Sequence, residues 1–211
     1  MNKETLDSIR DKNIDVEYFS YQAIKDPSFR EDVICELLTN KDIMVYYHCY
    51  YIVSKVSEIR PELFYDHWND FVSLLSHKNS YHRDIGLTIL ANLVSVDENF
   101  YFDNILKEYL KHIDDEKFMT AQCCVKNLIK IVKGRKDLRG VIVQTLLEVE
   151  KRVSYHEKQR ELLKFDVLNV FDEILEKSEY KDDMISFIKD CSNSISPKTK
   201  RKAKELIKKY F

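Results

Sequence analysis

Hydrophobic residues recur every three or four positions along almost the whole chain, with polar residues between them. One stripe runs through Phe29, Val33 and Leu37, and the next runs from Val45 to Val56. This spacing is that of amphipathic α-helices, and short polar turns separate the stripes. The pattern predicts paired helices within residues 4–25, 27–59, 61–96, 98–133, 138–175 and 182–211. Single helices are expected at 43–59, 81–96, 138–155 and 157–175.

A segment of the chain repeats with a shift of 35 residues, which places residues 74–96 on residues 109–131. Four identities survive the shift, namely Leu75/Leu110, His77/His112, Asn92/Asn127 and Leu93/Leu128. Pro27 and Pro61, which begin successive pairs, lie 34 residues apart and support the same period. A period of this length is typical of stacked two-helix units. We therefore expect an all-α fold, an α-α superhelix or solenoid of about six helical hairpins.

The expected organisation is one helical-repeat domain over residues 1–211. Residues 1–26 form an N-terminal cap unit, residues 27–176 the core repeats, and residues 177–211 a C-terminal cap that ends in a basic helix. Asp26 precedes Pro27 and predicts a helix start, because proline is favoured at the first helical position. Gly86 lies inside a predicted helix, so we expect a neighbouring helix to approach closely there. Gly134 is expected to end its helix as the C′ residue.

The amino-acid composition excludes several fold and function classes. Three glycines and three prolines provide too little turn chemistry for a β fold. The net charge of −2 gives no overall field that would select nucleic acid. No run of 18 apolar residues predicts a membrane span, and residues 1–10 lack the apolar run of a signal peptide. Five cysteines without a CxxC pair predict buried free thiols and a reducing, cytoplasmic location.

Residues 89–94, Ile-Leu-Ala-Asn-Leu-Val, resemble the "ALxNL" helix of armadillo repeats, and residues 125–129 and 168–170 echo it. Arg83-x-x-Gly86 is similar to the "VRxxA" start of the second helix in HEAT repeats. The resemblance to this HEAT/armadillo family covers about residues 28–176. The tetratricopeptide repeat has a similar period, but no unit contains its W-x-x-L-G signature.

In armadillo proteins the asparagine of that helix lines a concave groove and binds the backbone of an extended peptide. The resemblance implies this role for Asn92, Asn127 and Asn169, since an amide offers both a donor and an acceptor. The same helical stripes add four further candidate contacts, namely Tyr47, Tyr51, Thr88 and Lys130. An alternative interpretation is that the asparagines are tolerated polar residues where neighbouring helices meet.

The sequence contains no motif of a known catalytic site, and we expect a protein without enzymatic activity, cofactor or metal. His77 and His112 occupy equivalent turns, where hydrogen bonding within the turn is the favoured interpretation.

A contrary hypothesis is a nucleic-acid-binding protein similar to HEAT-like glycosylases that excise alkylated bases. Those enzymes present aromatic and acidic residues, which are available here at Trp68 and at 81–84, although Trp68 is also in phase with the core.

The last 15 residues carry seven Lys or Arg and one Glu, a net charge of +6, whereas the remainder carries −8. Four cations form a candidate patch for an anionic partner, namely Lys200, Arg201, Lys204 and Lys208. The alternative is a solenoid cap, whose outer face must be polar. The expected function is a cytoplasmic adaptor that binds a protein or extended peptide. Assembly into a larger oligomer is a third possibility, because tyrosine, of which there are 13, is enriched at interfaces.

Overall fold

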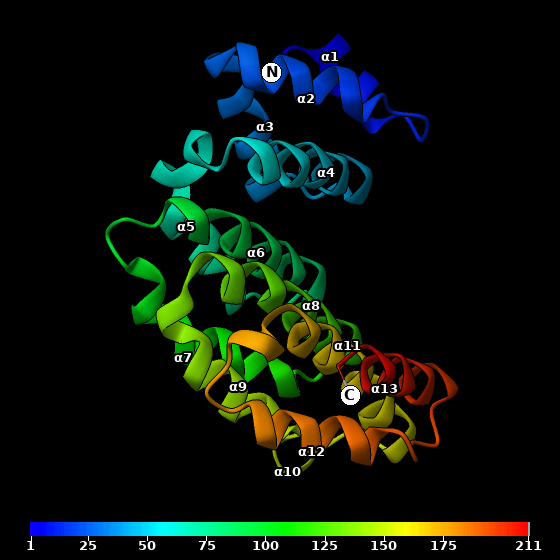
Figure 1. Ribbon diagram of the computed structural model, residues 1–211. Coiled ribbons are helices and arrows are strands. Elements are labelled where there is room, and N and C mark those ends of the chain that lie inside the picture. The colour runs from blue at the N-terminus through cyan, green and yellow to red at the C-terminus, as the bar shows by residue number, and fades with distance from the viewer. Residues whose placement is uncertain (211) are drawn as a thin grey trace.

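Helices form all of the regular secondary structure in residues 1–210, which the computed structural model describes (Figure 1). The expectation of an all-α protein is confirmed. Short 3₁₀ segments are labelled η. The elements are α1 (Lys3–Arg10), α2 (Val16–Lys25), α3 (Pro27–Thr39), α4 (Ile43–Ile59), η1 (Pro61–His67), α5 (Trp68–Leu75), α6 (Ser80–Leu93), η2 (Val94–Val96), α7 (Tyr101–Lys111), η3 (His112–Asp114), α8 (Phe118–Gly134), η4 (Lys136–Leu138), α9 (Arg139–Leu147), α10 (Val149–Arg152), α11 (Glu157–Ile174), η5 (Leu175–Lys177), α12 (Lys181–Cys191) and α13 (Pro197–Tyr210).

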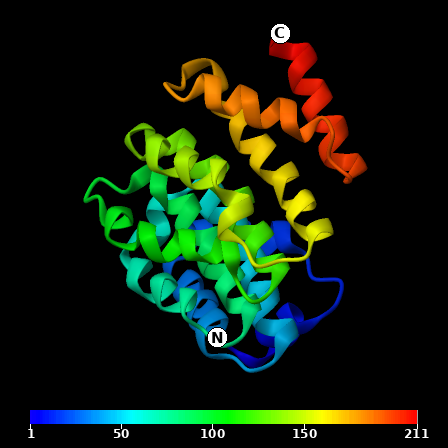
Figure 2. The ribbon, with the colours of Figure 1, turned by 90° about the horizontal axis from the view of Figure 1, so that it is seen from below.

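The second helices of successive pairs pack on one another in chain order. Helix α4 contacts α6, α6 contacts α8, α8 contacts α11, and α11 contacts α13. Helices α3, α5 and α12 pack against the second helix of their own pair. Figure 1 shows the resulting stack, and Figure 2 shows α12 and α13 beyond α11, at the end away from the N-terminus. Within residues 1–210, no helix has the length and hydrophobicity of a transmembrane span.

Local side-chain caps set several helix starts, as the sequence predicts. The Asp26 carboxylate accepts hydrogen bonds from the backbone N–H groups of Ser28, at 2.9 Å, and Phe29, at 3.2 Å. These bonds satisfy N–H groups that have no partner within the helix, and Pro27 needs none. Helix α4 has the predicted bounds, with Asp42 as its N-cap.

In two of the helical pairs, the first helix differs from the prediction. The third pair begins with 3₁₀ turns at η1 before α5 continues as an α-helix. The prediction of a single helix over residues 138–155 is wrong, because α9 ends at Leu147 and α10 covers only Val149–Arg152. Leu146 and Val149 are both buried on either side of this break. The apolar stripe therefore continues across it and gives no sign of the interruption.

Close packing explains why glycine occupies positions 86 and 134. A Cβ atom on Gly86 would lie 3.0 Å from the Leu74 Cβ atom and 3.0 Å from the Phe71 carbonyl oxygen, both in α5. The expected close approach of a neighbouring helix is confirmed. Gly134 is the last residue of α8 and does not have a positive φ, so its expected role as a C′ residue is wrong. A Cβ atom there would lie 3.2 Å from the Val94 side chain.

The cysteines divide between the core and the surface. Cys49, Cys124 and Cys191 are buried, as expected, but Cys123 is half-buried and Cys35 is exposed on α3. The prediction of five buried thiols is therefore wrong for Cys35, which lies on the polar side of the stripe formed by Val33, Ile34 and Leu37. Burial raises the pKa of the Cys49 thiol to about 12, so this thiol stays protonated near neutral pH.

A buried ion pair joins α6 to the turn before α8. The Arg83 guanidinium donates to both carboxylate oxygens of Asp115, at 2.9 and 2.7 Å, and to the His77 carbonyl oxygen at 2.9 Å. His112 Nδ1 lies 2.8 Å from the same carboxylate. In the equivalent turn, His77 Nδ1 accepts from the backbone N–H of Asn79 at 3.0 Å. The expected hydrogen bonding of both histidines within their turns is confirmed.

Helix α13 is attached to α11 through a half-buried carboxylate. The Asp172 side chain accepts hydrogen bonds from Lys202 Nζ at 2.8 Å, Lys209 Nζ at 2.8 Å and the Tyr210 hydroxyl at 2.9 Å. Burial opposes ionisation, but these three donors prevail and lower the pKa of Asp172 from 3.8 to about 2. The ionised form is thus stabilised in the folded protein.

Substitution of Asp172 by asparagine should show how much the ionised carboxylate contributes to stability. The depressed pKa of the carboxyl group in the folded state stabilises the fold above pH 4, and this contribution is lost as the pH falls through 2. We expect Asp172→Asn to lower the free energy of unfolding by about 2 kcal/mol at pH 7. The difference from wild type, measured by urea denaturation, should shrink below pH 4.

The neighbouring substitution Glu173→Gln is the matched control. Glu173 pairs with Lys133 at 3.0 Å, but both side chains are exposed, so a loss below about 1 kcal/mol is expected. A loss for Asp172→Asn that stays constant between pH 7 and 2 would contradict a role for the ionised carboxylate.

Candidate peptide-binding face

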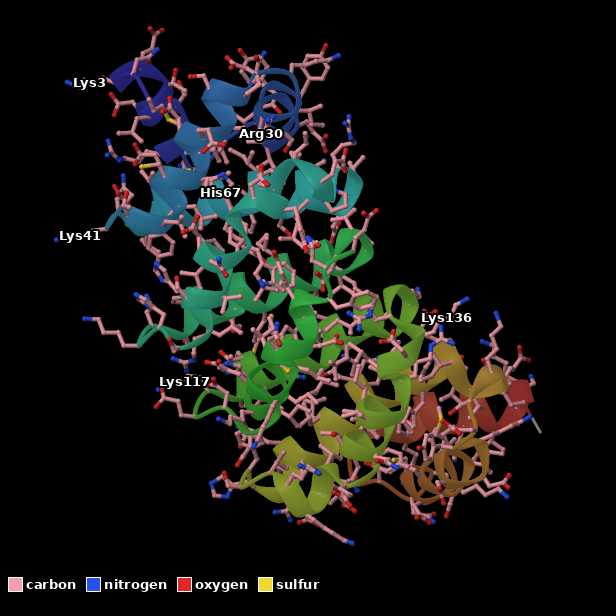
Figure 3. All side chains as sticks on the ribbon, turned by 90° about the vertical axis from the view of Figure 1, so that its left-hand side faces the viewer. Lys3, Arg30, Lys41, His67, Lys117 and Lys136 are labelled. Atoms are coloured by element: carbon pink, nitrogen blue, oxygen red, sulfur yellow. The ribbon has the colours of Figure 1, made fainter. Side chains whose placement is uncertain are left out.

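The predicted site residues fall on α4, α6 and α8, three neighbouring helices. Tyr47 and Tyr51 are one turn apart on α4, Thr88 and Asn92 one turn apart on α6, and Lys130 lies on α8. Figure 3 shows Lys41 and Lys117, which precede α4 and α8, along the same side of the molecule, and Lys136, which follows α8, on the other side. The N-terminal ends of these second helices therefore share one edge.

Asn92 connects all three helices. Its side chain is only 6% exposed, and its Nδ2 donates to the Ser57 hydroxyl at 2.8 Å and to the Ser54 carbonyl oxygen at 3.2 Å, both in α4. Its Oδ1 accepts from Lys130 Nζ, in α8, at 2.5 Å. The amide is thus held in one orientation, with its donor and acceptor groups both used within the protein.

The other two asparagines have different surroundings. Asn127 is 8% exposed, and its Nδ2 donates to the Cys123 carbonyl oxygen at 3.0 Å and the Thr88 hydroxyl at 3.2 Å. Asn169 is half-buried and donates to the Phe165 carbonyl oxygen of its own helix at 3.0 Å. Asn92 and Asn127 thus each bond to the preceding second helix, but Asn169 does not share that geometry. Peptide binding by the three residues stays a prediction.

A hollow of about 410 Å³ lies where the C-terminal parts of α4, α6 and α8 meet. It is lined by Glu58, Ala91, Asn92, Ser95, Lys130, Lys133 and Gly134. Lys130 Nζ reaches across it to the Glu58 carboxylate at 2.7 Å, and both side chains are partly exposed. This polar hollow therefore offers a cation, a carboxylate and a hydroxyl within one recess, which suits the donors and acceptors of a peptide backbone.

A second hollow, of about 360 Å³, lies at the other end of α4 and α6. It is lined by Ile43, Met44, Tyr47, His48, Tyr51 and Tyr81, and we call it the tyrosine hollow. The ring of Tyr47 is nearly perpendicular to those of Tyr51 and Tyr81, with centroid separations of 5.0 and 5.7 Å. Burial, followed by the influence of Tyr51 and Tyr50, raises the pKa of Tyr47 to about 12, so its hydroxyl is neutral at physiological pH.

Sequence reasoning found Tyr47 and Tyr51 but missed the residues that complete this hollow. The sequence places Tyr81 in the glycosylase-like set and indicates no role for Ile43 or Met44. All three are at least 36% exposed, although they are large and hydrophobic. Ile43, Met44 and Tyr81 lie at the starts of two adjacent second helices, on the same side as Tyr47. This position is the sequence feature that could have identified them.

The residues of the glycosylase-like set are dispersed by the fold. Trp68 is buried, with its ring edge against Phe102, so the expected core packing of this residue is confirmed. Arg83 is held by the ion pair with Asp115. Tyr81 is exposed on α6, whereas Asp84 is half-buried, and burial raises the pKa of its carboxyl group.

All four residues of the basic patch predicted on the last helix are exposed. Lys200, Arg201, Lys204 and Lys208 lie on the solvent side of α13, opposite the buried Thr199, Ala203 and Leu206. Within residues 1–210 none of the four makes an ion pair. These cations are therefore accessible to an anionic partner, and they also give the last helix a polar outer surface. The anionic partner stays a prediction.

Comparison with known proteins adds information on the fold alone. No family model matches the chain, and no curated protein matches it. A crystal structure described as an engineered protein is similar over 99% of this chain and 96% of its own, with a TM-score of 0.51 and 14% sequence identity. Its description names no ligand or activity. The likeness supports an all-helical fold and assigns no function.

Proposed function

We propose that this protein is a non-enzymatic helical-repeat scaffold of the cytoplasm, which binds another protein or an extended peptide on the face formed by α4, α6 and α8. In this proposal the helical stack is a HEAT/armadillo-like superhelix of about six hairpins, with this face on its concave side. The observation that carries the proposal is the polar hollow, where three successive second helices contribute Asn92, Lys130 and Glu58 to one recess.

The two hollows give the proposed site a length. Tyr47 and Glu58 lie on the same side of α4, eleven positions apart, which corresponds to ~16 Å at 1.5 Å per residue. An extended chain rises by ~3.3 Å per residue, so a segment of about five residues spans both hollows. Tyrosine side chains at one end supply large contact area, and the polar groups at the other end fix the register of the segment.

Obstruction of the polar hollow should abolish binding without unfolding the protein. Ser95 lines the hollow and is exposed, so Ser95→Trp adds a bulky ring there without disturbing the core. Peptides selected from a random displayed library against the wild-type protein should bind Ser95→Trp at least tenfold more weakly, as measured by calorimetry. Ser73→Trp, on the exposed side of α5 in the other layer, is the matched control and should bind normally.

Two results would contradict the proposal. One is a library that yields no peptide, and the other is a selected peptide that binds both tryptophan variants equally well. The salt dependence separates the nucleic-acid alternative, because phosphate contacts release counterions and binding then falls steeply with salt. Peptide binding through the tyrosines and the groups that line the polar hollow should fall much less steeply between low and moderate salt.

A further inference from the structure

The tyrosine hollow combines exposed aromatic faces with an absence of positive charge in its lining. Its walls are Tyr47, Tyr51 and Tyr81, with Met44 and His48 beside them, and no lysine or arginine is among the lining residues. Tyr51 and Tyr81 are 43% and 46% exposed, so two of the three rings are open to solvent. Exposure of this much aromatic surface is typical of a binding site.

Other aromatic rings of the protein are covered by its own cations. Lys198 Nζ lies 3.8 Å from the centroid of Phe165, the Arg135 guanidinium lies 4.6 Å from that of Phe100, and Lys25 lies over Tyr21. None of these cations lies over a ring of the tyrosine hollow. Tyr51 stacks on His48, but Tyr51 and Tyr81 both keep solvent-exposed ring surface that a cation from outside the chain can contact.

The surroundings of the hollow also favour a positive ligand. Asp84 follows Tyr81 by one turn on the same side of α6, and its carboxyl group is largely buried. The carboxylate is close enough to contribute to the raised pKa of Tyr47, after burial and the neighbouring tyrosines. An acidic group behind a wall of aromatic rings adds to the attraction of a cation.

We infer that the tyrosine hollow binds a methylated ammonium group, presented as the side chain of a methylated lysine on a partner segment. An unmodified ammonium is strongly hydrated, and this largely aromatic lining offers few acceptors to replace its water. Methyl groups spread the same charge over an apolar surface that can contact the ring faces directly. The identity of the ligand as part of a peptide rests on the proposed function, whereas the cation site itself does not.

The test uses three small probes and the 211-residue protein. These are Nε-trimethyllysine with acetyl and methylamide blocking groups, blocked lysine, and the neutral analogue in which carbon replaces the quaternary nitrogen. In NMR titrations, blocked trimethyllysine should bind about tenfold more tightly than either of the other two. Tyr51→Leu and Tyr81→Leu should each weaken its binding at least fivefold, because each removes one wall of the hollow.

Two matched variants separate ring chemistry from folding. Tyr51→Phe keeps the aromatic face and should bind within about twofold of wild type. Tyr21→Leu removes another exposed tyrosine, on α2, and should leave binding unchanged. Phosphocholine micelles should not bind more tightly than blocked trimethyllysine.

Several outcomes would overturn the inference. Equal binding of the neutral analogue would make the hollow an apolar site, and equal binding of blocked lysine would remove the role of the methyl groups. Preference for phosphocholine micelles would assign the site to a lipid headgroup, and unchanged binding by both leucine variants would place the site elsewhere. The two proposals are tested by different experiments. A failed trimethyllysine titration does not change what Ser95→Trp shows about the polar hollow. A failed peptide selection does not change what the titration shows about the tyrosine hollow.

Discussion

Replacement of Asp115 by alanine is expected to lower the free energy of unfolding by about 3 to 5 kcal/mol. The Arg83 and Asp115 side chains are 8% and 4% exposed and share two hydrogen bonds in a bidentate pair. Loss of the carboxylate leaves a buried guanidinium with only the backbone carbonyl groups of the preceding turn and the exposed carboxylate of Glu116 as partners. It also removes the acceptor of His112 Nδ1 and of the backbone N–H of Lys117, so the turn before α8 loses its ion pair with α6.

The control is the adjacent substitution Glu116→Ala. Glu116 approaches the same guanidinium at 3.3 Å, but its side chain is 68% exposed, so we expect a loss below about 1 kcal/mol. Urea denaturation followed by circular dichroism measures both variants. If Asp115→Ala costs no more than Glu116→Ala, the buried pair is not what joins these two helices.

The second large effect is expected at Gly86. Its missing Cβ atom leaves room for the backbone of α5, since a Cβ would lie 3.0 Å from the Phe71 carbonyl oxygen. Gly86→Val places a branched side chain at this contact and should destabilise the protein by about 2 to 3 kcal/mol. The gain of less than about 1 kcal/mol in helix propensity does not offset this overlap.

Gly140→Ala is a control at a helical glycine that has room for a side chain. A Cβ atom on Gly140 would lie 3.4 Å from the Tyr180 hydroxyl, an ordinary contact, so alanine there should be neutral or stabilising by up to about 1 kcal/mol. Thermal denaturation of both variants tests the argument. A Gly86→Val protein as stable as wild type would mean that α5 and α6 can separate at no cost.

Much of the fold could be predicted because its determinants are local. The start of α3 depends on Asp26 and Pro27, and the bounds of α4 follow from Asp42 and the apolar stripe that begins after it. Features set by distant neighbours were not predictable in the same way. The role of Gly134 depends on the approach of Val94, and the break after Leu147 lies in an uninterrupted apolar stripe.

The candidate site was predictable to a smaller extent. Helical phase placed Tyr47 and Tyr51 on one side of their helix, because residues three or four apart share a side, and the repeat matched that stripe with the one that contains Lys130. It could not show that Asn92 bonds to Ser57 and Lys130, since those contacts depend on the spacing and rotation of three helices. The resemblance supplied a role for the asparagines, whereas the fold supplies the hollows beside them.

The central claim is that the face formed by α4, α6 and α8 holds an extended partner segment. NMR titration of the isotope-labelled protein with a library-selected peptide tests it most directly. The account predicts that backbone signals of Asn92, Ser95 and Lys130 shift at saturation, together with those at the start of α4. Shifts confined to α3, α5 and α7, or to α13, would contradict it.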